Sequence, residues 1–263
     1  MNIYRDFLKC LSFCLLTAAF SFLIFSISYR EAGAFDHTHK LYGKVLESYE
    51  KDGLVDYRGL KSDSGDLRAY IEQASSVTGE EFEGWSQAEQ LAFLLNLYNA
   101  RTFQLIIDNY PVESIKMIAA DSKGPWEEPI VLLFGDKITL NALENDFIRK
   151  SYKEPRIHFA LVCAAKGCPP LLGKPYTGSK LNGQLESQTR KFLADKDKNY
   201  VDSANEVIRL SPVFQWFEGD FSDKSGSVQA FVEPYFGQTE LDDYKIEYTN
   251  YDWSLNDFSP QNN

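Results

Sequence analysis

The chain has 263 residues, of which 44% are hydrophobic and 14% aromatic, and its net charge is −11. A negative charge of this size is unfavourable for binding nucleic acid or an anionic lipid surface, so we expect neither as a partner. The richness in aromatic residues argues against a disordered protein. The sequence carries no cofactor motif, and we expect no cofactor.

The first 34 residues resemble an export signal. Arg5 and Lys9 precede an almost wholly apolar run from Leu11 to Tyr29, and Ala32-Gly33-Ala34 has the small-x-small pattern of a cleavage site. Cleavage would leave residues 35–263, whose length suits a single globular domain. Retention would instead anchor that domain in the inner membrane by residues 11–29, the only membrane contact that we expect. Both alternatives place the domain outside the cytoplasm, in the periplasm or secreted.

Helical patterns dominate the remaining sequence. The firmest is the helix from Ser86 to about Asn109, because Ser86 and Glu89 form a capping box and Pro111 stops the helix just beyond its end. Ser211 and Pro212 are typical of a further helix start. The predicted helices cover residues 37–49, 66–74, 86–109, 141–151, 178–195 and 227–235.

Strand patterns are shorter and fewer. They cover residues 130–134, 137–140, 157–163, 207–210 and 245–251. Gly135-Asp136 separates the first two and is a two-residue hairpin signal. The run from Ile157 to Cys163 is continuous, apolar and partly β-branched, which favours a buried central strand over a helix. Together the patterns predict an α+β fold, a helix-rich single domain around a small mixed or antiparallel sheet.

Two cysteines follow the leader, Cys163 and Cys168, with Gly167 allowing the chain to turn between them. In an exported protein such a pair predicts a structural disulfide. The alternative is that one of the two is a nucleophilic thiol. Their spacing is not that of a zinc finger and no second pair lies nearby, so we expect no metal site.

His158 is the candidate general base or acid of the same segment. On a strand, His158 and Cys163 would point to opposite faces, so a dyad between them would require a bulge, whereas Cys168 lies beyond the glycine turn. Glu144, on the preceding helix, is the carboxylate that could orient the imidazole. The alternatives are a hydrogen-bonded histidine in the core and a solvated glutamate on a helix.

Asn96 and Asn99 interrupt an apolar helix and share one of its faces. Burying an amide costs free energy unless it is hydrogen-bonded, so each must bind either a neighbouring backbone or a substrate. A last cluster consists of Trp216, Glu218, Asp220 and the C-terminal Tyr251-Asp252-Trp253. Aromatic residues beside carboxylates often line carbohydrate or peptide grooves, but they also build cores.

Five motifs span most of the chain after the leader. They are LVDY at Leu54–Tyr57, AFLLNLYNA at Ala92–Ala100, RIHFALVCAAKGCPPL at Arg156–Leu171, SPVFQWFEGDF at Ser211–Phe221 and YDWSLN at Tyr251–Asn256. With these motifs in this order the chain resembles the domain-of-unknown-function 547 family, as an exported bacterial member. The resemblance implies no activity. It places several candidate residues in or beside family motifs: Asn96, Tyr98, Asn99, Glu144, His158, Cys163, Cys168 and Pro169.

Our leading hypothesis from the sequence is a hydrolase or acyl-transfer enzyme. His158 would act as the base, oriented by Glu144, with a free cysteine as nucleophile and an asparagine donating to a developing oxyanion. The candidate residues are, for catalysis, His158, Glu144, Cys163 and Cys168 and, for substrate binding, Asn96, Asn99, Tyr98, Arg156 and Trp216. The alternative is a non-catalytic extracytoplasmic binding module with the cysteines as a structural disulfide. The partner in either case is an unidentified small molecule, peptide or glycan.

Overall fold

The computed structural model describes residues 34–119, 121, 123–237 and 240–258. The predicted signal peptide or anchor lies outside these residues. The chain divides after Ala34, and the part from Phe35 onward forms one compact unit. This boundary coincides with the predicted start of the mature chain. Within the described ranges, no helix is long and apolar enough to cross a membrane.

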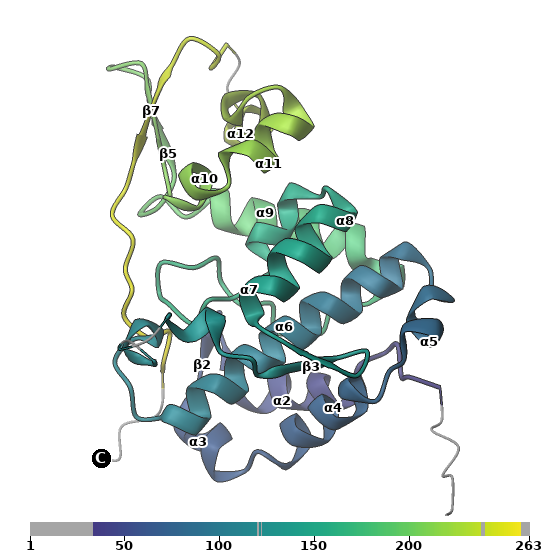
Figure 1. Ribbon diagram of the computed structural model, residues 1–263. Coiled ribbons are helices and arrows are strands. Elements are labelled where there is room, and N and C mark those ends of the chain that lie inside the picture. The colour runs from purple at the N-terminus through teal and green to yellow at the C-terminus, as the bar shows by residue number, and fades with distance from the viewer. Residues whose placement is uncertain (1–33, 120, 122, 238–239, 259–263) are drawn as a thin grey trace, which may run out of the picture. The chain divides into compact units, whose positions relative to one another are not determined.

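The long helix α6 (Gln87–Asn109) runs through the middle of this unit (Figure 1). It begins where predicted, because the Ser86 hydroxyl accepts a hydrogen bond from the Glu89 backbone at 3.3 Å and the Glu89 carboxylate accepts one from the Ser86 backbone at 3.0 Å. Most of its residues are buried, since it is apolar around nearly its whole circumference.

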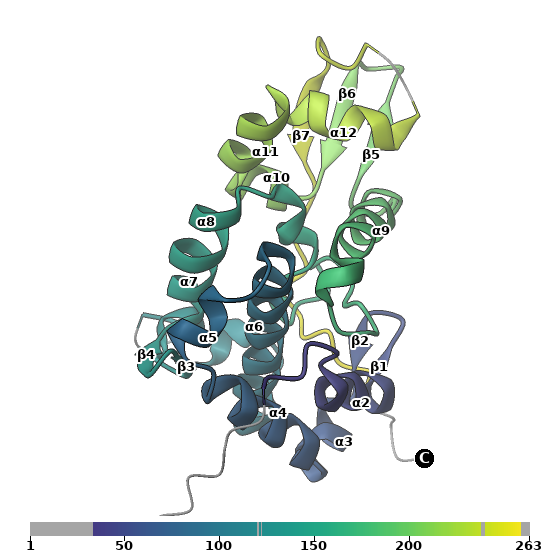
Figure 2. The same cartoon turned by 90° about the vertical axis from the view of Figure 1, so that its right-hand side faces the viewer.

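A layer of short N-terminal elements packs against α6 (Figures 1 and 2). It consists of α2 (Lys40–Tyr49), β1 (Glu50–Lys51), β2 (Leu54–Val55), α3 (Tyr57–Ser62), α4 (Gly65–Ser75) and α5 (Gly79–Glu83). The helices predicted at residues 37–49 and 66–74 are therefore confirmed, although the first begins three residues later than expected. Their apolar faces and that of α6 build the larger of two hydrophobic cores.

After α6 come two short 3₁₀ helices, η1 (Ile115–Met117) and η2 (Pro125–Glu127), and then the hairpin of β3 (Val131–Leu133) and β4 (Asp136–Ile138). Leu133 pairs with Asp136, so the turn residues are Phe134 and Gly135, with φ of 53° and 91°. The predicted Gly135-Asp136 turn is wrong by one residue. A two-residue turn of this kind needs positive φ at both central positions, and Gly135 supplies the second of them.

The helix predicted at residues 141–151 is confirmed but has an unexpected winding. It starts as α7 (Leu140–Ala142), continues as the π-helix η3 (Leu143–Arg149) and ends as α8 (Lys150–Tyr152). A π-helical stretch inside an α-helix is uncommon and often marks a functional position. Glu144 lies in this stretch.

The strand predicted at residues 157–163 is wrong. Pro155–Phe159 is the 3₁₀ helix η4, and the chain that follows is irregular. The Asn99 side chain bonds the backbone oxygen of Ala160 and the backbone N–H of Val162, which are the groups that a neighbouring strand would use. The apolar run is buried as predicted, but a side chain rather than a sheet satisfies its backbone.

The C-terminal half contains η5 (Gly178–Lys180), α9 (Leu181–Leu193), β5 (Tyr200–Asp202), β6 (Val207–Leu210), α10 (Val213–Trp216), α11 (Glu218–Ser225), α12 (Val228–Phe236) and β7 (Lys245–Tyr248). The start of α9 still packs in the first core, and the elements from the end of α9 onward form a second core around a small sheet. β6 is central, antiparallel to β5 and parallel to β7. The sheet is thus mixed, and the predicted α+β fold is confirmed. The strand predicted to reach Tyr251 ends at Tyr248.

Beyond β7 the chain returns from the second core to the first (Figure 1). Gly167 donates to the carbonyl of Asp252 at 2.8 Å, and Asn256 donates to the carbonyl of Ala164 at 3.1 Å. The Tyr57 hydroxyl donates to the Asn256 side chain at 2.9 Å. These bonds attach the C-terminal segment to the cysteine-containing loop and to the N-terminal layer.

Candidate active site

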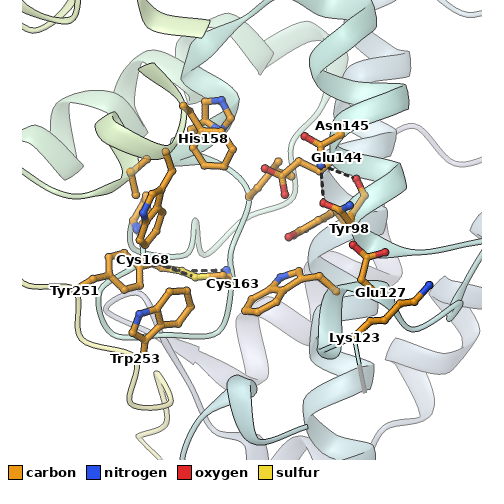
Figure 3. A pocket seen from close by; sticks show the side chains of 17 residues that line it. Tyr98, Lys123, Glu127, Glu144, Asn145, His158, Cys163, Cys168, Tyr251 and Trp253 are labelled. Atoms are coloured by element: carbon orange, nitrogen blue, oxygen red, sulfur yellow. Dashed lines mark hydrogen bonds between the residues drawn. A yellow bond between two sulfur atoms is a disulfide. The ribbon is translucent and has the colours of Figure 1, made fainter. Parts of the chain in front are cut away.

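A cavity of about 370 Å³ lies where the two cores meet (Figure 3). Distant parts of the sequence contribute to its walls: α6, η2, the π-helix, the segment 158–169, α10 and the C-terminal segment. Its lining residues are Tyr98, Lys123, Trp126, Glu127, Asn141, Glu144, Asn145, His158, Leu161, Cys163, Cys168, Pro169, Val213, Trp216, Phe217, Tyr251 and Trp253.

Glu144 is the carboxyl group most affected by this environment. It accepts a hydrogen bond from the Tyr98 hydroxyl, which in turn accepts one from the Trp126 side chain. Burial raises the pKa of Glu144 to about 7, and the negative charge of Asp220 acts in the same direction. The hydrogen bond from Tyr98 and the charge of Arg149 oppose this rise. Glu144 therefore changes its protonation state near neutral pH.

His158 also lines the cavity, but its partner differs from the predicted one. Its Nε2 lies 2.7 Å from Oδ2 of Asp220, on α11, and its ring stacks on Phe217 with the centroids 3.8 Å apart. The prediction that Glu144 orients His158 is thus wrong, because Asp220 occupies that role. Burial lowers the pKa of His158, whereas the hydrogen bond to Asp220 acts to raise it.

Asp220 joins the two cores through a second partner. Arg149, at the end of the π-helix, donates from Nε to Oδ2 at 2.7 Å and from Nη2 to Oδ1 at 3.0 Å. The hydrogen bond from His158 is the main reason why the pKa of Asp220 lies well below its usual range, and Arg149 lowers this pKa further. Asp220 is therefore ionised at neutral pH, and His158 donates its Nε2 proton to it.

Replacing Asp220 with asparagine is expected to lower the free energy of unfolding by about 2 kcal/mol at pH 7, because Arg149 and the buried His158 lose their shared anion. Urea unfolding measures this loss. Because the folded-state pKa is depressed, the carboxylate stabilises the protein above pH 3.8, and the difference between variant and wild type shrinks as the pH falls below that value.

Asp223→Asn is the matched control, since Asp223 lies on the same helix and is exposed. Its stability should stay within about 0.5 kcal/mol of the wild type. Equal losses from the two substitutions would show that the Asp220 contacts contribute nothing specific.

Asn96 and Asn99 do not line the cavity. The Asn96 amide donates to the Tyr176 carbonyl at 2.8 Å and accepts from the Tyr176 N–H at 2.9 Å. Asn99 makes the equivalent pair of bonds to Ala160 and Val162, both at 2.9 Å. The predicted substrate-binding and oxyanion roles are therefore wrong, because both side chains are fully buried and occupied by backbone. The alternative prediction, that both asparagine side chains bind a neighbouring backbone, is confirmed.

The other predicted binding residues divide between two places. Tyr98 and Trp216 line the cavity, and Trp216, 46% exposed, stands at its opening. Arg156 lies elsewhere, paired with Glu154 at 2.8 Å and with Glu186 at 3.5 Å. Its predicted role in the same site is wrong, because these two carboxylates hold its side chain outside the cavity.

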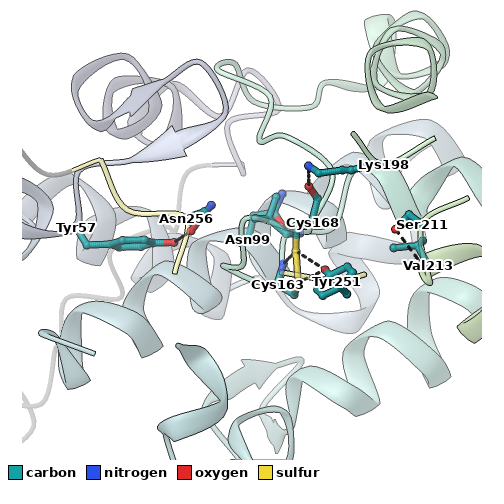
Figure 4. Close-up of a disulfide and its surroundings, with 10 residues drawn as sticks. Tyr57, Asn99, Cys163, Cys168, Lys198, Ser211, Val213, Tyr251 and Asn256 are labelled. Carbon is teal, nitrogen blue, oxygen red and sulfur yellow. Dashed lines mark hydrogen bonds between the residues drawn. A yellow bond between two sulfur atoms is a disulfide. The ribbon is translucent and has the colours of Figure 1, made fainter. Parts of the chain in front are cut away.

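Cys163 and Cys168 form a disulfide, as the structural alternative predicted (Figure 4). Both line the cavity. The Tyr251 hydroxyl lies 3.0 Å from the Cys163 sulfur and 3.2 Å from the Cys168 sulfur. With both sulfurs bonded, neither cysteine provides the thiol nucleophile of the leading sequence hypothesis. Instead the disulfide forms part of the wall and holds Tyr251.

Several lining residues were not singled out from the sequence. Trp126 and Lys123 follow α6 in a region without a motif, and Asn141 and Asn145 read as ordinary helix residues. Asp220 was noted only beside Trp216, and its pairing with His158 spans 62 residues. No local signal reveals a contact over that separation. In the part of the chain that the structure describes, no group of three or more His, Cys, Asp or Glu side chains could hold a metal ion.

Residues 82–193 match the family described as "Protein of unknown function, DUF547". This match confirms the family predicted from the motifs, and it spans α6, Glu144, His158 and both cysteines. The family description carries no activity. No curated protein and no solved structure matches the chain.

Proposed function

We propose that this protein is a hydrolase in which the Glu144 carboxyl group transfers the proton and water is the nucleophile. The supporting observation is a carboxyl group desolvated inside an aromatic-walled cavity, hydrogen-bonded to Tyr98, with its pKa raised to about 7. A general base works best when its pKa is close to the working pH. The disulfide supports water as the nucleophile, because it removes both thiols.

The reaction needs one proton to move twice. The Glu144 carboxylate takes a proton from water while the water oxygen bonds to the carbonyl carbon of an ester or amide, and as the tetrahedral intermediate collapses the protonated Glu144 gives this proton to the leaving oxygen or nitrogen. We assign the proton transfer to Glu144 rather than to His158. The Nε2 of His158 is bound to Asp220, and its side chain is only 1% exposed.

The disulfide also supports a location outside the cytoplasm, as the sequence of the leader predicts. Structural disulfides persist in oxidising compartments and are rare in the cytosol. We therefore propose that the hydrolase acts in the periplasm or after secretion.

A panel of chromogenic esters and peptide amides, with acetylated sugars among the esters, tests the activity. For any substrate that is turned over, kcat/KM should rise with pH through an apparent pKa near 7, because the free enzyme needs the Glu144 carboxylate. Titration of Glu144 by NMR gives an independent measurement that needs no substrate. A folded-state pKa below about 5, close to the value of an ordinary glutamate, would contradict the proposal.

A non-catalytic binding module is the second candidate. It is favoured by the exposed Trp216 at the opening of the cavity, since exposed aromatic residues often contact ligands. In that case ligand binding would survive the substitution Glu144→Gln, and the wild-type protein would turn over no member of the panel.

A further inference from the structure

Aromatic side chains line one side of the cavity in a continuous row. The rings of Trp216 and Trp253 stack with their centroids 5.7 Å apart and their planes at 29°, whereas the Tyr251 ring is tilted by 52° to that of Trp253, with the centroids 4.6 Å apart. We call the three residues Trp216, Tyr251 and Trp253 the aromatic platform. All three line the cavity, so the platform presents apolar surface to a ligand. Trp126 also lines the cavity, but its side chain is bonded to Tyr98.

Neighbouring groups hold two residues of the aromatic platform, Tyr251 and Trp253, in place. The Lys116 ammonium group lies 4.3 Å from the Trp253 ring centroid, and the Tyr251 hydroxyl contacts both sulfurs of the disulfide. The backbone bond from Gly167 to Asp252, at 2.8 Å, fixes the segment between these two aromatic residues. Side chains held in this way lose little conformational freedom when a ligand binds.

The opposite side of the cavity is polar. Figure 3 shows Tyr251 and Trp253 on one side and Glu144, Tyr98 and Glu127 on the other. A ligand between the two sides would therefore meet flat apolar rings on one face and hydrogen-bonding oxygens on the other.

This asymmetry matches a sugar ring. A pyranose has an apolar face of C–H groups that packs on an indole or phenol ring, and hydroxyl groups around its rim that donate to carboxylates. An acyl chain would cover the desolvated Glu144 carboxyl group and offer it no hydrogen bond beyond the one from Tyr98. The net charge of −11 disfavours a phosphorylated or otherwise anionic ligand.

We infer that the substrate of this site is an acylated glycan, with one pyranose ring stacked on the aromatic platform and its hydroxyl groups directed at Glu144 and Glu127. This inference rests on the proposed function and specifies its substrate class. The volume of about 370 Å³ accommodates a ligand at the small end of the usual range for binding sites, which fits one or two sugar rings. Trp216, at the opening of the cavity, would contact the adjacent sugar ring of the glycan.

Binding is tested with the full wild-type chain and, in parallel, with the full chain carrying Glu144→Gln, which prevents turnover but also alters one of the proposed hydroxyl partners. Cellotetraose, chitotetraose, xylotetraose and maltotetraose are titrated by calorimetry and by tryptophan fluorescence, with tetra-alanine as the peptide comparison. We expect at least one glycan to bind and tetra-alanine not to bind. Adding Trp216→Ala should weaken that glycan at least tenfold, whereas Tyr200→Ala, which removes another exposed aromatic residue outside the cavity, should leave its Kd unchanged.

The inference is overturned if none of the four glycans binds, if tetra-alanine binds in their place, or if Trp216→Ala leaves the glycan Kd unchanged. These failures are distinct from a failure of the proposed function. Glycan binding without hydrolysis of glycan derivatives by the wild-type protein would contradict the role of Glu144 and leave the glycan assignment standing. If the protein instead hydrolyses a peptide or simple ester in a reaction that requires Glu144, and binds no glycan, the role of Glu144 stands and the glycan assignment is contradicted.

Discussion

Glu144→Gln is expected to remove the activity and to stabilise the folded protein. The loss of the only group that we assign to proton transfer should lower kcat/KM by about 10²- to 10⁴-fold. The gain in stability follows from the raised pKa, because keeping a carboxylate ionised inside the cavity costs free energy that a neutral amide avoids. A catalytic group that is also a destabilising group is common in enzymes.

The stability difference between the wild type and Glu144→Gln depends on pH, and the pKa shift of Glu144 gives its sign. The pKa of Glu144 rises from 4.5 to about 7 on folding, so between these values the folded state binds more protons than the unfolded state. The wild type therefore loses stability relative to the variant as the pH rises from about 4.5 to 7. Above pH 7 the variant should be more stable by about 2 kcal/mol, and below pH 4 the two should agree.

Urea unfolding of both proteins at pH 4, 6 and 8 measures this difference. Asp146→Asn is the matched control, because Asp146 lies on the same π-helix and is exposed. It should change neither the activity nor the pH dependence of stability. A Glu144→Gln protein that is less stable than the wild type at pH 8 would mean that the bond from Tyr98 outweighs desolvation.

Asn99→Ala is expected to lower the free energy of unfolding by about 3 kcal/mol, because it leaves two buried backbone groups, the Ala160 carbonyl and the Val162 N–H, without partners. The side chain is completely buried, so water cannot take its place without rearrangement. Since these backbone groups precede Cys163, the loss should also loosen the wall of the cavity.

Urea unfolding measures the loss in free energy of unfolding. Hydrogen exchange of the Val162 amide shows whether the structure is loosened at this segment. Asn109→Ala, at the exposed end of the same helix, is the control and should cost less than about 1 kcal/mol. If the Val162 N–H stays protected from exchange in the Asn99→Ala variant, another group accepts its hydrogen bond. The Asn99 side chain would then not be what holds residues 160–162 in their conformation.

Local patterns were sufficient to predict the helices and part of the site. The capping box at Ser86 is complete within four residues, so α6 begins where its sequence indicates. Cys163 and Cys168 are the only cysteines after the leader and Gly167 lets the chain turn between them, so the sequence predicted their disulfide for an exported protein. Glu144 and His158 were recognised as chemically unusual residues, and both reach the cavity.

The partners of these residues were decided by tertiary structure. An apolar run such as residues 157–163 predicts burial, but it does not reveal whether a strand or the Asn99 amide will satisfy its backbone. Likewise, nothing near Glu144 or His158 indicates that Tyr98 will bind the first and Asp220 the second. By itself the sequence determined which segments are helical and which side chains carry chemistry, because these depend on neighbours along the chain. Only the folded protein decided which of them meet in one cavity, because those contacts join residues tens of positions apart.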